Sequence, residues 1–464
     1  MASTHATGYF LLADDHALVA EATSQTPGAI FGTGLFGVYR PLGFMVARMA
    51  GWLDPSHGGW SAVTLLLHAG NAAMLALLAT RLGYPAFAAG LAGSLFLWSP
   101  WSSEAYLWFS GLFDVGAAFA VLLATLASTI DAEGAARRAA TVGLALAGCL
   151  LAAGFKENGY LAAGIVPAIA LSGFRPSSTA RAAVTGLLAA LGAALVLAFR
   201  STLLAPGSTP YGVSEFGARL LSVAAIAPAA SNVRGLLLWP VPAVWADTSR
   251  LVATLFIWPV GATITAGMAV VALAGRARAW LQVAALVICL APTAFFQIDV
   301  ETITPRRYLY LAGVPLCLLV GGAAASRLRR DTGGQPAAGM AAAATGLLLA
   351  ASLAGASQVA LWRRVTTTAR CAMDDFGRRA KTVIGPVYVD NMPFAVNHGP
   401  FILLDYDFGY VHGQRPPAAD VAFRRAVLGF APDGRLVLEG YGEPPQDAAR
   451  RTALSLDLCL GPRP

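Results

Sequence analysis

Charged side chains are scarce in this sequence. Asp, Glu, Lys and Arg make up 12% of its 464 residues, about half of the roughly 25% found in an average soluble domain. Hydrophobic residues make up 56%, and the mean hydropathy is +0.62. So few charges cannot solvate the surface of a soluble protein of this length. The composition therefore predicts an integral membrane protein.

Cysteines are few, and several well-known catalytic loops are absent. The chain has five cysteines and no Asn-x-Ser/Thr sequon, Walker A loop, HExxH or GxSxG motif. Cys149, Cys289 and Cys317 lie in apolar stretches and are interpreted as packing residues. Cys371 and Cys459 lie in the polar C-terminal tail. If the tail is in an oxidising compartment, these two can form a disulfide; free thiols are the alternative.

Long apolar runs dominate what is present. About 20 apolar residues span a bilayer, and the sequence predicts a polytopic, all-α membrane bundle of about ten transmembrane helices. The predicted ranges are 60–81, 86–100, 112–130, 139–153, 158–173, 182–199, 251–274, 279–297, 306–325 and 338–361. The ranges 139–153 and 158–173 are short for full crossings.

The distribution of Arg predicts the orientation, because cytoplasmic loops are enriched in basic residues. One set of loops carries Arg81, Arg137, Arg138, Arg175, Arg181, Arg276, Arg278, Arg327, Arg329 and Arg330. The opposite loops are mixed or acidic. Both termini are therefore predicted to be extracytoplasmic, in a plasma (inner) membrane. The net charge of +7 is explained by topology and anionic membrane lipid, so no nucleic-acid partner is predicted.

Three regions follow from this pattern. Residues 1–59 form an extracytoplasmic entry segment, 60–361 the transmembrane bundle, and 362–464 a small extracytoplasmic α/β tail. In the tail, 363–382 is predicted to be a basic helix that leaves the membrane. Strand-like runs follow at 386–392, 401–408 and 435–441, separated by Pro, Gly and Asn.

Asp14 and Asp15 are the first candidate site residues, in the entry segment before an apolar region. Adjacent carboxylates can take a proton from an attacking hydroxyl, or can hold a divalent cation through oxygen ligands. The alternative is an ordinary turn or helix cap. Arg40 follows at the start of a predicted helix, as a functional cation or an interfacial anchor.

Four polar residues lie in or beside the first three predicted spans. His68 and Asn71 share a helix face; the favoured prediction is that they bond neighbouring helices, and substrate binding is the alternative. Glu104 and Asp114 bracket the outer loop SPWSSEAYLWFSGLFD. Carboxylates among aromatic side chains can hold a sugar, and a solvated loop with an aromatic belt is the alternative.

Lys156 and Glu157 form a tight outer turn. A lysine on this side opposes the usual charge bias and can act as a point charge for phosphate; a local Lys156–Glu157 pair is the alternative. Arg306, Arg307 and Tyr308 stand at the outer end of another span. Guanidinium groups bind phosphate bidentately, although Arg and Tyr also serve as membrane anchors.

The order of these motifs resembles the GT-C superfamily of membrane glycosyltransferases. It is most similar to the transmembrane and tetratricopeptide-repeat O-mannosyltransferases and their bacterial relatives. The resemblance covers about residues 9–320 and lies in six motifs: LLADDHALV, YRPL, HAGN, LFLWSPWSSEAYLWFSGLFD, KENG and RRYLY.

The resemblance implies an inverting transferase that moves a sugar from a polyprenyl-phosphate carrier to a protein, lipid or glycan acceptor outside the cell. It implies that Asp14 or Asp15 is the general base and that Glu104 lies near sugar or acceptor. Lys156 and Arg306 or Arg307 would then contact the carrier phosphate.

Three features depart from the family pattern. The usual His-Pro is Ser99-Pro100, tetratricopeptide repeats are absent, and the helix that normally precedes the Asp-Asp loop is absent from this sequence. We therefore expect an upstream helix to be missing.

A non-catalytic transporter or polyprenyl-lipid flippase is the alternative function, for which inverted repeats and broken helices would be expected.

Overall fold

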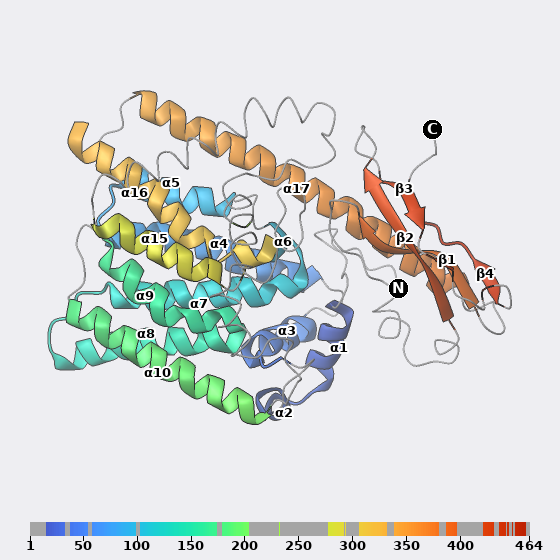
Figure 1. The fold of residues 1–464 in the computed structure, drawn as a ribbon, viewed down its shortest axis with the longest axis horizontal. Helices are drawn as coiled ribbons and strands as arrows, with labels where there is room; N and C mark the ends of the chain where they lie inside the picture. Colours follow the sequence, from blue (N-terminus) through green and yellow to red (C-terminus); the bar gives the residue numbers. More distant parts are fainter. Residues whose placement is uncertain are drawn as a thin grey trace, which may run out of the picture.

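The computed structural model describes residues 15–32, 38–53, 58–98, 103–173, 179–203, 232, 277–291, 293, 306–331, 338–379, 387–396, 421–430, 436–441, 443–444, 448 and 451–460. This part of the chain is mostly helical and carries one small sheet (Figure 1). The predicted helical class with a small α/β tail is confirmed at this level.

Apolar helices occupy the predicted ranges, except for 251–274, which lies outside the described residues. The helices are α4 (Gly58–Arg81), α5 (Ala86–Leu97), α7 (Leu112–Ser128), α8 (Ala135–Phe155), α9 (Ala162–Leu171), α10 (Thr179–Leu203), α15 (Ala277–Leu290), α16 (Gly313–Asp331) and α17 (Ala338–Arg379). Within the described chain, four helical runs are long and apolar enough to cross a membrane: Ser61–Arg81, Phe109–Ser128, Ala135–Phe155 and Ala338–Arg379. The other apolar stretches are shorter: Ala86–Leu97, Ala183–Ala198 within α10, Arg278–Leu290 and Gly313–Leu328.

Small residues let the bundle helices approach closely. A Cβ on Gly93 of α5 would lie 2.8 Å from the backbone oxygen of Ala72 in α4, so only glycine permits this crossing. Close packing through small residues is typical of helix pairs in membranes, where no hydrophobic force drives helices together. Helix α7 runs through the middle and is mostly buried.

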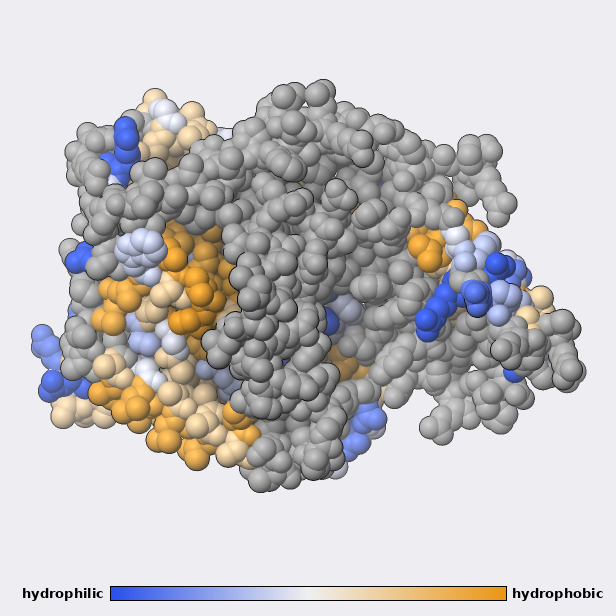
Figure 2. All heavy atoms as spheres, viewed as in Figure 1, coloured by the Kyte–Doolittle hydropathy of each residue, from blue (hydrophilic) through white to orange (hydrophobic). Residues whose placement is uncertain are grey.

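The outer faces of the bundle are apolar, as Figure 2 shows on one side. Leu66 of α4 is 72% exposed and Leu187 of α10 is 71% exposed. Exposed leucines and valines also line α8, α15 and α17. A surface of this kind would be an aggregation hazard in water, whereas it suits lipid. The chain is therefore a membrane protein, as predicted.

Short helices gather at one end of the bundle, the end from which α17 continues toward the sheet (Figure 1). They are α1 (Asp15–Ser24), α2 (Pro27–Gly32), α3 (Pro41–Leu53), α6 (Ser103–Leu107) and the 3-10 turns η2 (Phe109–Gly111), η3 (Glu157–Leu161) and η8 (Arg306–Leu309). Helices α1 to α3 pack on α7 through a separate apolar cluster that includes Phe44 and Phe113. The described part of the entry segment is thus a folded cap on the bundle.

The described part of the tail contains a four-stranded sheet of order β3-β2-β1-β4. Strand β1 (Val387–Val396) pairs in parallel with β2 (Val421–Phe430) and β4 (Thr452–Leu454), and β3 (Leu436–Tyr441) is antiparallel to β2. The predicted strands at 386–392 and 435–441 match β1 and β3. The predicted strand at 401–408 lies outside the described residues, and the sequence analysis missed β2 and β4.

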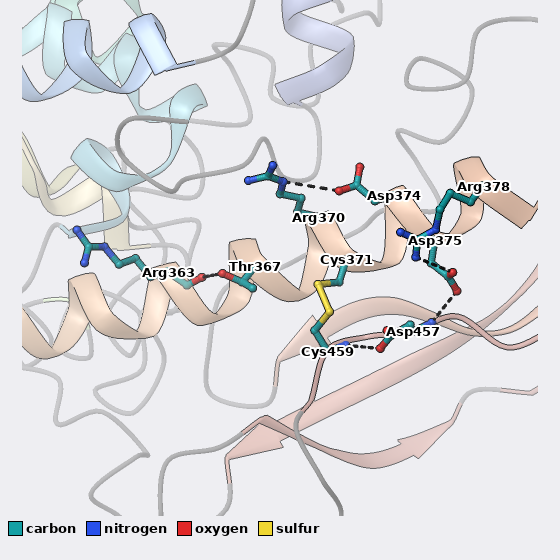
Figure 3. The surroundings of a disulfide bond; sticks show 9 residues. All are labelled: Arg363, Thr367, Arg370, Cys371, Asp374, Asp375, Arg378, Asp457 and Cys459. Carbon is teal, nitrogen blue, oxygen red and sulfur yellow. Dashed lines mark hydrogen bonds and ion pairs between the residues drawn. A yellow bond between two sulfur atoms is a disulfide. The ribbon is translucent and has the colours of Figure 1, made fainter. Parts of the chain in front are cut away.

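Helix α17 is continuous across the predicted boundary at residue 362 and ties the tail to the bundle. Cys371 of α17 forms a disulfide with Cys459, with 6.0 Å between their Cα atoms (Figure 3). Beside it, the Asp375 carboxylate accepts the backbone N–H of Asp457 at 2.9 Å. The pairing of the two tail cysteines is therefore confirmed.

Candidate functional site

Ser110 brings the entry segment and the RRYLY motif together at the capped end of the bundle. The backbone N–H of Ser110, in η2, donates to Asp15 Oδ1 of α1 at 3.0 Å. The hydroxyl of Ser110 accepts from Arg307 Nη1 of η8 at 2.7 Å. Three segments that are far apart in the sequence thus meet around one serine, which sequence reasoning did not single out.

Arg307 is held by α6 as well. Its backbone N–H donates to Glu104 Oε2 at 2.8 Å, and its Nε lies 3.9 Å from Glu104 Oε1. The guanidinium carbon lies 4.3 Å from the ring centre of Trp108, a cation–π contact. The contacts with Glu104 and Trp108 thus hold the guanidinium of Arg307 in one position.

Lys156 pairs with Asp114, across the gap between the end of α8 and the start of α7. Lys156 Nζ lies 2.7 Å from Asp114 Oδ1 and 2.6 Å from Oδ2. The two side chains are only 7% and 1% exposed. The ammonium also lies 4.6 Å from the ring centre of Tyr308, so the candidate lysine is next to the candidate tyrosine.

Arg40 pairs with Glu157, which links the YRPL and KENG motifs. Arg40 donates to both Glu157 oxygens, with Nη2 to Oε2 at 2.7 Å and Nε to Oε1 at 3.2 Å. This pair is partly exposed. The alternative prediction of a local Lys156–Glu157 pair is wrong, because each of these residues instead bonds a partner on another segment.

Two glycines permit the tight turns that carry these residues. A Cβ on Gly111 would lie 2.1 Å from the backbone oxygen of Ala105, and one on Gly159 would lie 2.1 Å from that of Ala152. Gly111 lets η2 fold back on α6 so that Ser110 faces Arg307. Gly159 lets η3 fold back on α8 directly after Lys156 and Glu157.

Acids outnumber bases among the described side chains of this cluster. Its three cations are Arg40, Lys156 and Arg307, and its four carboxylates are Asp15, Glu104, Asp114 and Glu157. Glu104 is fully buried, and burial raises its pKa to about 7 against the opposing effect of Arg307. Among the described side chains, neutralisation of one carboxylate would therefore favour the binding of an anion.

His68 and Asn71 lie inside the bundle and bond its helices. His68 Nδ1 lies 2.7 Å from the Tyr310 hydroxyl, and its ring stacks on Tyr106 with 4.2 Å between centres. Asn71 donates to the Tyr310 hydroxyl and to the Val115 carbonyl, both at 3.0 Å. These contacts agree with the helix-bonding role, which was the favoured prediction for the two residues.

Some predicted site residues fall outside what the structure describes. Asp14 is outside the described residues, and so is the side chain of Arg306, although its backbone begins η8. Within the described residues, no group of three or more His, Cys, Asp or Glu side chains could hold a metal ion. The proposed cation site at Asp14 and Asp15 therefore stays a prediction.

Trp108 and Ser110 were missed although both lie in the quoted loop motif. Neither side chain is charged, so neither was predicted as a site residue. Their signal was position: both lie between Glu104 and Asp114 in WFSGLFD.

No protein-family model, curated protein or solved structure matches the chain. The geometry of the site therefore carries the functional argument.

Proposed function

We propose that this protein is a GT-C-type membrane glycosyltransferase with about ten spans, which moves a sugar from a polyprenyl-phosphate carrier to an acceptor at the extracytoplasmic face. The acceptor is a protein, a lipid or an envelope glycan. The observation that carries the proposal is the convergence of the separated motifs at one end of the bundle, through the contacts of Ser110, Arg307 and Lys156.

The transfer would proceed by single displacement. Asp14 or Asp15 takes the proton of the acceptor hydroxyl, whose oxygen attacks the anomeric carbon of the sugar. The bond from that carbon to the carrier phosphate breaks, and the phosphate leaves with one additional negative charge. A preorganised cation lowers this barrier because it stabilises the charge as it develops.

Arg307 is the best-placed cation for the phosphate. Its guanidinium contacts Ser110, which also holds the carboxylate of Asp15, so one of the two candidate bases is linked to the phosphate-binding group through one residue. Lys156 and Arg40 are each engaged by a carboxylate. Their positive charges add to that of Arg307, and the carboxylates of Asp114 and Glu157 hold them in position.

The partly exposed side chains at this end of the bundle would let an acceptor from water or from the membrane reach the site. Arg40 and Glu157 retain 23% and 27% of their side-chain exposure. At the other end, Arg81, Arg137 and Arg138 are exposed, as expected for a cytoplasmic face. The site would then face the extracytoplasmic side, where lipid-linked sugars are available without nucleotide.

The test is sugar release from a panel of radiolabelled polyprenyl-phosphate sugars by the full chain in nanodiscs. We expect release with one donor, and loss of release in Asp14→Asn or in Asp15→Asn, whichever residue is the base. Asn at position 15 can still accept the Ser110 N–H, so folding should persist. Absence of release with every donor would refute the transferase and favour a transporter or flippase.

A further inference from the structure

Carboxylates outnumber cations among the described side chains of the site, and this affects how a carrier phosphate can bind. The inference rests on the proposed function. A polyprenyl-phosphate sugar is a phosphodiester with one negative charge. Among the described side chains, it adds a fifth negative group, after Asp15, Glu104, Asp114 and Glu157, to a cluster with three cations. Buried charges without partners are strongly destabilised, so neutralisation of one carboxylate would favour binding.

The three ion pairs differ in how tightly the acid holds its cation. Asp114 holds Lys156 through both oxygens at 2.6 and 2.7 Å, and Glu157 accepts several hydrogen bonds from Arg40. Glu104 is different.

Glu104 faces the side chain of Arg307 only across 3.9 Å. In the described part of the chain, its Oε1 is buried and accepts no hydrogen bond. Its other oxygen is occupied by the backbone N–H of Arg307, a contact that a neutral carboxyl can keep. The Arg307 guanidinium is therefore the cation that an incoming anion can take over at the lowest cost.

We propose that Glu104 is the exchangeable counter-ion of Arg307: the carrier phosphate takes its place beside the guanidinium, and the displaced carboxylate is neutralised by a proton. One proton is taken up from water and resides on Glu104 while the phosphate is bound. No covalent bond of the carrier changes in this step.

The surroundings of Glu104 favour the neutral form. Burial already raises its pKa to about 7, while Arg307 from η8 and Lys156 from the end of α8 lower it and Asp114 from α7 raises it. When the phosphate pairs with Arg307, the guanidinium stabilises the Glu104 carboxylate less. The pKa of Glu104 therefore rises further.

The other elements packed on α6 bring no charge to Glu104 among the described residues. Helix α17 presents Gln358 to Ser103 at 3.3 Å, and α4 presents His68 to Tyr106. Among the described residues, the charges that act on Glu104 in addition to its burial are therefore those of Arg307, Lys156 and Asp114.

A neutral Glu104 also suits the chemistry. As the bond to the sugar breaks, the phosphate acquires a second negative charge beside Arg307. A charged Glu104 carboxylate beside Arg307 would repel this second negative charge, whereas a protonated carboxyl does not. Glu104 is thus a positioning residue whose protonation state follows the charge on the carrier.

The linkage has a definite sign. A group whose pKa rises on binding takes up a proton, so affinity is highest at low pH and falls as the pH passes the pKa of the free state. With that pKa at about 7, carrier affinity should fall about five- to tenfold between pH 6 and pH 8.

The experiment is titration calorimetry of the protein in nanodiscs with farnesyl methyl phosphate. This sugar-free diester carries a constant charge between pH 5 and pH 9, so the ligand itself does not titrate. Two buffers of different ionisation enthalpy report the protons taken up. We expect roughly half a proton or more per diester at pH 8, and almost none at pH 5.5.

Glu104→Gln is the test variant, because the amide keeps an oxygen for the Arg307 N–H but cannot titrate. It should bind the diester with the same affinity at pH 6 and pH 8 and without proton uptake. Glu157→Gln is the matched variant in the same site, and it should retain the pH dependence of the wild type.

The outcomes separate the two proposals. Binding by the wild type without proton uptake refutes the role of Glu104 and leaves the transferase standing. Proton uptake that persists in Glu104→Gln assigns the proton elsewhere and also refutes it. If the wild type binds no diester at any pH, the phosphate site of the proposed function is wrong as well.

Discussion

Removal of the Lys156 ammonium should destabilise the protein strongly. Lys156→Met keeps most of the side-chain volume but leaves Asp114 with its charge, 1% exposed and without its partner at 2.6 Å. Breaking a buried ion pair by removing one member costs about 3–5 kcal/mol, because an uncompensated charge remains. We expect a loss of this size in the free energy of unfolding, measured by reversible unfolding with sodium dodecyl sulfate in mixed micelles.

Arg40→Met supplies the matched comparison. Arg40 and Glu157 lie at the same end of the bundle and are as close, at 2.7 Å, but they are 23% and 27% exposed. Partly exposed pairs contribute about 0–1 kcal/mol, so this variant should lose at most about 1 kcal/mol. The difference between the two variants measures the effect of burial at nearly equal distance.

A second substitution tests the physical reason. Lys156→Met combined with Asp114→Leu removes both charges, and apolar replacement of a buried pair is often nearly neutral. The double variant should therefore recover most of the loss. The reasoning is refuted if Lys156→Met costs no more than Arg40→Met, or if the double variant is as unstable as Lys156→Met alone.

Two further predictions concern the glycine turn and the disulfide. Gly159→Ala places a Cβ 2.1 Å from the backbone oxygen of Ala152 and should cost about 1–3 kcal/mol, whereas Gly90→Ala meets nothing within 4 Å and should not destabilise; equal unfolding curves would show that the turn is not tight. Cys371→Ser opens the link to Cys459, which spans 88 residues, and should destabilise the tail by up to about 4–5 kcal/mol on the loop-entropy model. Limited proteolysis should cut the tail faster in this variant and in the reduced wild type, and unchanged rates in both would contradict the stapling role.

The sequence predicted most of the helical ranges because a bilayer imposes a length and a composition on each span. Local sequence decides whether a run such as 60–81 is apolar enough, and α4 (Gly58–Arg81) follows that range closely. Helix α17 contains both the predicted span 338–361 and most of the predicted basic helix 363–382. Only their continuity was not predicted, because the polar composition after residue 361 marks the end of the apolar run and not the end of the helix.

The tail was harder to predict. Strand β1 contains the apolar run VYV, and β3 contains LVL, so both carry a signal. Strand β2 has Arg424 and Arg425 side by side in its middle, which interrupts the alternation that marks a half-buried strand. Strand β4 has only three residues, too few for any periodic signal.

The sequence by itself determined that this is a membrane protein and which polar residues depart from the pattern of its spans, because both follow from the local cost of charge in lipid. Only the tertiary structure decided how those residues pair. Lys156 bonds Asp114 and not its neighbour Glu157, and Ser110 joins Asp15 to Arg307. Such pairings depend on which helix ends meet across the bundle, and no local pattern in the chain encodes that order.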